Sequence, residues 1–197
     1  MRAGRSIAVS AAAFAALLLP PEPAGAVITT TLLSLSANRL VLRVGSALGT
    51  IDIVDFAVIG DAIRPNAVPV VSPNTVAIVM TAEKSLLLGL NLNSARLTVD
   101  SSAGMACVPG SGCGSVTIPF TTVSWQTQNP DVSGLDIRSG AFTGDAGQQI
   151  ALFGLPLLTN LSSSTVMNNL LSFSYANSTL YPAGTYRGRV VFTATMF

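Results

Sequence analysis

The two cysteines are the side chains whose type and spacing say most about chemistry in this sequence. Cys107 and Cys113 flank a short segment that contains Pro109, Gly110 and Gly112. Proline and glycine let so short a segment turn back on itself, and neighbouring cysteines pair in an oxidising compartment. A metal site needs more ligands than two thiolates, and the chain contains no histidine. We therefore predict a structural disulfide between Cys107 and Cys113 rather than a redox or metal site.

Groups that could carry out catalysis are sparse. The absence of histidine excludes Ser-His-Asp and Cys-His catalytic arrangements and most zinc sites. The sequence has neither a glycine-rich phosphate loop nor a calcium-loop pattern. A glycoside hydrolase needs only two carboxylates, which can be distant in sequence, so that class stays open. We predict no enzymatic activity and no catalytic, cofactor-binding or metal-binding residue. After residue 26 the carboxylates are Asp52, Asp55, Asp61, Glu83, Asp100, Asp131, Asp136 and Asp145.

Trp125 is the only tryptophan and has two interpretations. It ends an apolar, strand-like segment that contains Pro119. An exposed indole in a surface protein is a platform on which a sugar ring can stack. A buried indole at the end of a strand is instead a core anchor whose N–H needs a hydrogen-bond acceptor. We favour the core anchor and keep the sugar platform as the alternative.

The first residues form a secretory signal peptide by their pattern. Arg2 and Arg5 precede an apolar run over residues 7–19, and Ala24-Gly25-Ala26 matches a cleavage site. The run is too short for a permanent membrane helix, which needs about 20 residues. We therefore predict that residues 1–26 are cleaved and that residues 27–197 form a single exported domain with no integral membrane segment. Its destination is the periplasm, the cell surface or the extracellular space.

Charge is scarce and balanced along the chain. Charged residues make up 10% of the sequence, against about 25% in an average soluble domain. Cleavage after residue 26 removes two arginines and one glutamate from ten basic and nine acidic side chains, which leaves no net charge. Nucleic-acid binding needs a clustered basic surface, so it is not expected. A polar surface near zero net charge favours self-association.

Short apolar runs with alternating polarity, separated by turn residues, predict an all-β fold. We expect an Ig-like or pilin-like antiparallel β-sandwich of roughly nine or ten short strands, with no cofactor. Residues 75–81 and 86–93 are joined by a short polar link and predict a hairpin, while residues 148–158 fit either a strand or a turn of helix. The other expected strands cover residues 28–35, 39–44, 51–58, 96–99, 116–125 and 170–175, with a short edge strand near 68–71.

The last segment alternates most regularly. Pro182 and Gly184 favour a tight turn, after which we expect one long strand that runs from Tyr186 to Phe197. The opposite face holds arginines and threonines together with Val191 and Phe197. The face expected to close the core consists of Tyr186, Val190, Phe192, Ala194 and Met196.

Residues Thr117–Trp125 and Tyr181–Ala194, together with the signal peptide, resemble exported bacterial β-sandwich proteins. The closing segment is also similar to the last strand of pilin-like and surface Ig-like domains. In pilins assembled by a chaperone and an usher, a glycine precedes a C-terminal strand that pairs with a partner's strand, and Gly184 lies near that place. Two features differ from such pilins: Met196 stands where they carry a penultimate tyrosine, and the cysteines are too close for their long-range disulfide.

The resemblance and the missing catalytic groups together favour a non-enzymatic exported structural or adhesion protein. The resemblance implies that such a protein associates with itself or with other surface subunits by β-strand pairing. One alternative is a polysaccharide-binding surface module with Trp125 and the tyrosines as platforms. A small outer-membrane β-barrel, suggested by the alternating last strand, and a hydrolase are further alternatives.

Overall fold

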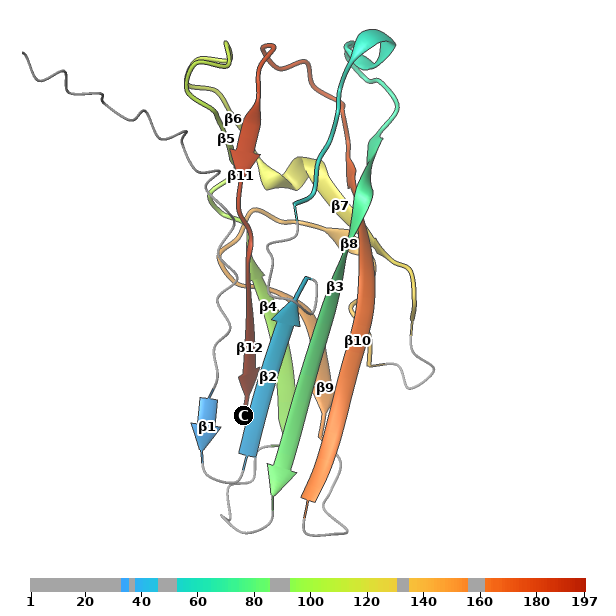
Figure 1. The fold of residues 1–197 in the computed structure, drawn as a ribbon, viewed down its shortest axis with the longest axis vertical. Coiled ribbons are helices and arrows are strands. Elements are labelled where there is room, and N and C mark those ends of the chain that lie inside the picture. The colour runs from blue at the N-terminus through green and yellow to red at the C-terminus, as the bar shows by residue number, and fades with distance from the viewer. Residues whose placement is uncertain (1–32, 36–37, 46–52, 86–92, 131–134, 156–161) are drawn as a thin grey trace, which may run out of the picture.

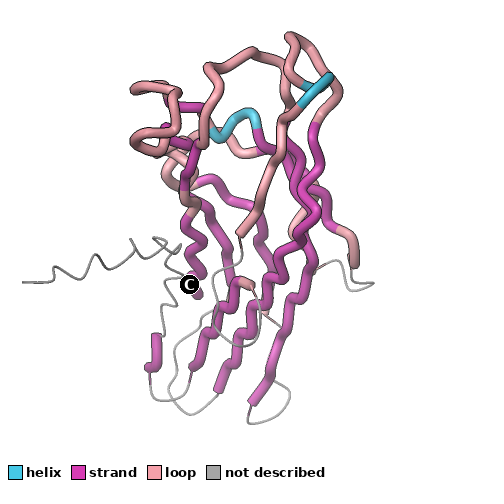
Figure 2. The backbone as a smooth tube through the Cα atoms, turned by 45° about the horizontal axis from the view of Figure 1, so that its top comes forward, coloured by secondary structure: helices cyan, strands magenta, loops and turns pink. Residues whose placement is uncertain are grey.

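The fold is all-β, as the sequence predicts. The structure, a computed structural model, describes residues 33–35, 38–45, 53–85, 93–130, 135–155 and 162–197. These residues form twelve strands and two single-turn 3₁₀ helices, η1 (Gly60–Ala62) and η3 (Phe120–Thr122). Figure 2 shows the strands as the main body of the molecule, with most loops gathered at one end. The predicted signal peptide lies outside the described residues.

The larger of two facing layers is a six-stranded antiparallel sheet, named sheet A here, with the order β1-β2-β3-β10-β7-β8. Two long strands, β3 and β10, dominate it and extend along much of the molecule (Figure 1). Their ladder has one irregularity, between Ser172 and Ser174. The strands are β1 (Leu33–Leu35), β2 (Asn38–Val44), β3 (Val70–Ser85), β10 (Ser162–Tyr175), β7 (Val123–Thr127) and β8 (Gly140–Ala141).

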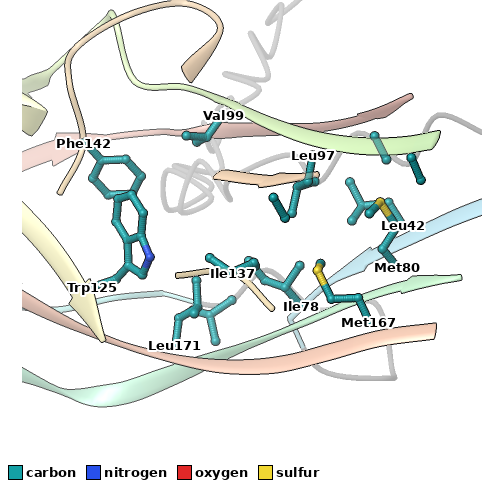
Figure 3. Packing of buried hydrophobic residues seen from close by; sticks show 14 of the residues in the cluster. Leu42, Ile78, Met80, Leu97, Val99, Trp125, Ile137, Phe142, Met167 and Leu171 are labelled. Atoms are coloured by element: carbon teal, nitrogen blue, oxygen red, sulfur yellow. The ribbon is translucent and has the colours of Figure 1, made fainter. Parts of the chain in front are cut away.

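The opposite layer, sheet B, has three antiparallel strands in the order β12-β4-β9. These are β12 (Val191–Met196), β4 (Ser94–Asp100) and β9 (Gln148–Gly154). Period-two alternation explains its central strand, because Ala95, Leu97 and Val99 are fully buried while the residues between them are not. Figure 3 shows Leu97 and Val99 facing side chains of sheet A across the core. Antiparallel sheets packed face to face in this way form a β-sandwich.

A third, smaller sheet lies at the loop-rich end of the molecule. Sheet C has the order β11-β5-β6, formed by β11 (Tyr186–Gly188), β5 (Met105–Cys107) and β6 (Thr117–Ile118). Figure 1 places these strands above sheet B, next to the loops between β10 and β11. The disulfide loop and the last connection of the chain therefore meet at this end.

The expectation of one long closing strand is wrong. The chain forms β11 in sheet C and β12 in sheet B, with residues 189 and 190 between them. The change occurs after Gly188, where a Cβ atom would collide with the carbonyl oxygen of Gly104 and lie 2.7 Å from the ring of Phe120. Such a close approach needs glycine. The segment crosses another stretch of backbone there and then joins a different neighbour.

A further expectation from the sequence is wrong. Residues 53–58, the described part of the strand expected over 51–58, form no strand, although Val54, Phe56 and Val58 still pack against the core. Residues 75–81 of the expected hairpin with 86–93 lie in β3, which pairs with β2 and β10. Residues 86–92 lie outside the described residues. The uncertain segment 148–158 begins with strand β9.

Candidate functional site: the unpaired edge of β12

The candidate site is a sheet edge, because edge strands present unpaired backbone N–H and C=O groups to other chains. Natural proteins protect such edges by keeping them very short. In the described residues, the edge strands of sheet A are β1, with three residues, and β8, with two. Those of sheet C are β11, with three, and β6, with two. In the described residues, only sheet B has long edge strands, β12 with six residues and β9 with seven.

The β9 edge is interrupted. Leu97 of β4 lies opposite Ala151, and the next residue of β4, Thr98, lies opposite Gln149, so Ile150 has no counterpart. This is a β-bulge, which bends a strand and disturbs any further ladder. The start of β9 is also occupied, because the Gln148 side chain accepts from the Thr143 N–H at 3.0 Å and donates to the Ala141 carbonyl at 2.8 Å. Strand β9 thus carries the kind of protection that edges normally have.

In the residues that the structure describes, the β12 edge is neither short nor bulged. Its register against β4 is regular from Val191, opposite Asp100, to Met196, opposite Ala95. The strand contains no proline and no charged side chain. The structure describes no strand on the side of β12 that faces away from β4. A regular, uncharged edge of six residues is a template for pairing.

The hydrogen bonds at the end of β12 show which backbone groups point outward. Phe197 and Ser94 exchange two hydrogen bonds, each with N···O at 3.0 Å, so they form a hydrogen-bonded pair. Such pairs alternate with non-hydrogen-bonded pairs along an antiparallel ladder. The backbone groups of Phe192, Ala194 and Met196 are therefore directed away from β4, toward the unpaired side. These three residues supply the donors and acceptors on the side of β12 where the structure describes no neighbouring strand.

The same three residues point their side chains into the sandwich. They lie opposite Val99, Leu97 and Ala95, all fully buried residues of β4. Ala194 is buried, but Phe192 and Met196 are only half-buried although they pack against the core. Strand β2 of sheet A lies close to β12, and Phe192 and Met196 are still only half-buried at this edge. A strand added there would extend both the backbone ladder and the apolar inner face.

The outer face of β12 is uncharged but not uniformly polar. Val191 and Thr193 precede Thr195, whose Oγ1 is buried without a hydrogen-bond partner in the described part of the chain. Phe197 follows the strand and is 51% exposed, with the guanidinium of Arg96 5.2 Å from its ring centroid. The exposed aromatic ring at this edge is a feature that a partner strand can cover.

The predicted residues divide between two sheets. Ala194 is buried in the core and the other four residues of the predicted closing face, Tyr186, Val190, Phe192 and Met196, pack against it half-buried. Tyr186, however, belongs to sheet C, where its ring lies 6.3 Å from that of Tyr181 and its hydroxyl donates to the Pro182 carbonyl at 2.9 Å. The structure thus makes two local arrangements from what the sequence presents as one strand face.

The cysteines lie in sheet C and its loop. A disulfide joins Cys107 and Cys113, whose Cα atoms are 5.7 Å apart. Gly184 packs directly on it, since a Cβ atom there would meet the Cys113 Sγ at 2.5 Å. Ser111 ties the two segments together, because its hydroxyl accepts from the Thr185 N–H at 3.1 Å. The disulfide loop therefore holds the turn that precedes β11.

Trp125 is a core residue, and the sugar-platform interpretation of it is wrong. Its side chain is 5% exposed, and its Nε1 donates to the Arg138 carbonyl at 2.9 Å. Its ring lies 4.9 Å from that of Phe142, as Figure 3 illustrates. A buried indole with a satisfied N–H anchors packing and offers no face to a ligand.

Groups with acid–base or metal chemistry do not gather in the described residues. There, no group of three or more His, Cys, Asp or Glu side chains could hold a metal ion. Lys84, the only lysine, is buried and donates to the Asn93 Oδ1 at 2.9 Å. Asp100 accepts from the backbone N–H and the hydroxyl of Ser102, which hold the pKa of that carboxyl below its usual value. Each of these contacts is local and explained by the fold.

Sequence reasoning missed the residues that make β12 an edge. It placed Val191 and Phe197 correctly on the face opposite Phe192, but gave that face no role. Edge position depends on which distant segments pair, and the sequence carries no local signal for it beyond the uncharged run itself.

Comparisons with family models, curated proteins and solved structures find no match to the chain. In the part of the chain that the structure describes, no helix is long and apolar enough to cross a membrane.

Proposed function

We propose that this protein is a non-enzymatic, exported structural or surface subunit that associates through the edge of β12. The observation that carries the proposal is the contrast among the sheet edges. In the part of the chain that the structure describes, four edge strands have at most three residues and β9 is bulged, whereas β12 is regular, uncharged and backed by half-buried apolar side chains. An edge strand without such protection is a place where another chain can add a strand.

Export is supported by the disulfide and by the leading sequence. A disulfide persists in oxidising compartments such as the periplasm or the cell exterior. The basic start, apolar run and cleavage pattern over residues 1–26 fit the same route. A chain without net charge after cleavage does not repel its own copies, which suits a subunit.

An Ig-like or pilin-like relationship is part of the proposal. Its support is the antiparallel sandwich and a last strand that alternates, lies at a sheet edge and carries the closing core residues. Pairing at a sheet edge uses main-chain hydrogen bonds for affinity and alternate side chains for specificity. The edge of β12 offers both.

Sedimentation velocity of the exported chain, residues 27–197, tests the proposal. We expect the sedimentation coefficient to rise between micromolar and millimolar concentrations. Thr193→Lys places a charge on the exposed outer face of β12 and is expected to weaken association by roughly tenfold or more. Gln149→Lys places the same charge on the β9 edge and should leave association unchanged.

A chain that stays monomeric at every concentration, alone and with periplasmic extract, would rule out the proposed association. Equal effects of the two lysine substitutions would show that general surface charge, rather than the β12 edge, controls association.

A further inference from the structure

We infer that β12 pairs with β12 of a second copy, antiparallel, around a two-fold axis that passes through Ala194. This inference rests on the proposed function and names its partner. The product is one continuous six-stranded sheet across two molecules, in the order β9-β4-β12-β12-β4-β9. The interface is closed, because the same edge is used by both copies.

The direction of the strands selects this pairing. Strands β12 and β9 are both antiparallel to β4, so they run parallel to one another. Translating one copy to bring its β9 edge beside β12 of the next therefore makes a parallel ladder, and it uses the bulged strand. A two-fold axis instead makes an antiparallel ladder from two regular strands, which is the more stable pairing per residue.

The direction of the backbone N–H and C=O groups limits the register in which two β12 strands can pair. The outward-directed groups belong to Phe192, Ala194 and Met196, so hydrogen-bonded pairs across the axis must join residues of this set. These residues also share the inner face, and pairing them keeps the apolar faces of the two sheets on the same side. A shift by one residue would place Phe192 opposite an outer-face threonine and would expose the core side chains.

The register centred on Ala194 makes every side-chain pair favourable. Phe192 lies opposite Met196 of the second copy, an aromatic–sulfur contact that covers two half-buried side chains. Val191 lies opposite Phe197 of the second copy, an aromatic–β-branched pair that covers an exposed ring. Thr193 of the second copy lies opposite Thr195, whose buried Oγ1 has no partner in the described residues. Threonine pairs across strands form hydrogen bonds.

Charge also permits a strand to pair with itself here. Like charges directly opposite each other destabilise a ladder, and in a two-fold pair every charge meets a like charge nearby. The segment from Val191 to Phe197 has no charged side chain. Arg96, which lies opposite Thr195 on β4, already contacts the Phe197 ring.

Cysteine cross-linking tests the register. Thr193 and Thr195 of the second copy would form a non-hydrogen-bonded pair, with Cα atoms about 4.5 Å apart, which suits a disulfide. Thr193→Cys and Thr195→Cys chains are purified separately, mixed at a concentration where the wild type associates, and oxidised. We expect a covalent dimer from the mixture and at most a trace from either variant alone. Thr193→Cys mixed with Gln149→Cys, on β9, should give none.

Each other outcome has a definite meaning. A covalent dimer from Thr193→Cys alone would place the axis at Thr193 and overturn the inferred register. No cross-link in any combination, while the wild type still associates, would overturn β12 self-pairing and leave the proposed function standing. A wild-type chain that does not associate at all would contradict both the β12 self-pairing and the proposed function.

Discussion

The burial of each side chain decides how much that residue contributes to the stability of the sandwich. Leu97 lies at the centre of sheet B and is completely buried, opposite Ala194 on the neighbouring strand. Leu152, on β9, is 54% exposed although it is the same residue type. The two leucines therefore form a matched pair for testing the core assignment.

Leu97→Ala is expected to lower the free energy of unfolding by about 2–5 kcal/mol, because it removes buried methyl groups and leaves a cavity. Leu152→Ala is expected to change it by less than about 0.5 kcal/mol. Urea denaturation of both variants measures the difference. Equal losses would contradict the arrangement of sheet B.

Asp100 provides a prediction about pH. The backbone N–H of Ser102 and then its hydroxyl favour the charged carboxylate and hold its pKa below the usual value. Because the pKa in the folded state is depressed, the stabilisation is present above the pKa of the unfolded state and is lost as pH falls through the folded one. NMR titration should show a low pKa for Asp100, which Ser102→Ala partly restores. An ordinary pKa in the wild type would contradict these hydrogen bonds.

Among the elements, the turn before β11 depends on a close contact with the disulfide loop. Gly184→Ala would bring a Cβ atom to 2.5 Å from the Cys113 Sγ and 3.0 Å from its backbone nitrogen. We expect a loss of about 1–3 kcal/mol, the usual range for overpacking. Gly147→Ala is the control, since a Cβ atom there has no neighbour within 4 Å. Thermal unfolding of both variants, with the disulfide intact, makes the comparison; equal stabilities would contradict the contact.

The strands show which features the alternation of apolar and polar residues predicts and which features it does not predict. It correctly places Phe192, Ala194 and Met196 on the inner face of the last strand. It cannot detect the break after Gly188, because the parity of inward residues continues from Tyr186 through Val190. Residues 53–58 fail in another way, since their alternate side chains reach the core without any strand beside them. The alternation of apolar and polar residues predicts which side chains are buried. A β-strand also needs a neighbouring strand with which its backbone can pair.

At the scale of the whole molecule, the fold class follows from composition and pattern, and the candidate site does not. Scarce charge, short apolar runs and two close cysteines are enough to predict a β-sandwich with a disulfide. The role of β12 depends on strand order, which brings residues 94–100 beside residues 191–196 and joins β4 to β9 on its other side. Pairing between segments so distant in sequence leaves no local signal.

Two-fold pairing of β12 would cover the β12 edge of both copies and leave the bulged β9 strands at the two ends of the shared sheet. The half-buried Phe192 and Met196 would become part of a continuous core, and no long regular edge would remain in the described residues. Loss of the open edge would also prevent further growth of the sheet on that side. The predicted assembly is therefore a finite dimer of the wild-type chain rather than a fibre.

Backbone amide exchange along β12, measured by NMR at low and high protein concentration, tests the central claim most directly. We predict that the amides of Phe192, Ala194 and Met196 exchange rapidly in the monomer and become protected as concentration rises. Those of Thr193 and Thr195 should be protected throughout, because they bond to β4. Exchange at Phe192, Ala194 and Met196 that is independent of concentration, in a chain that associates, would contradict the account.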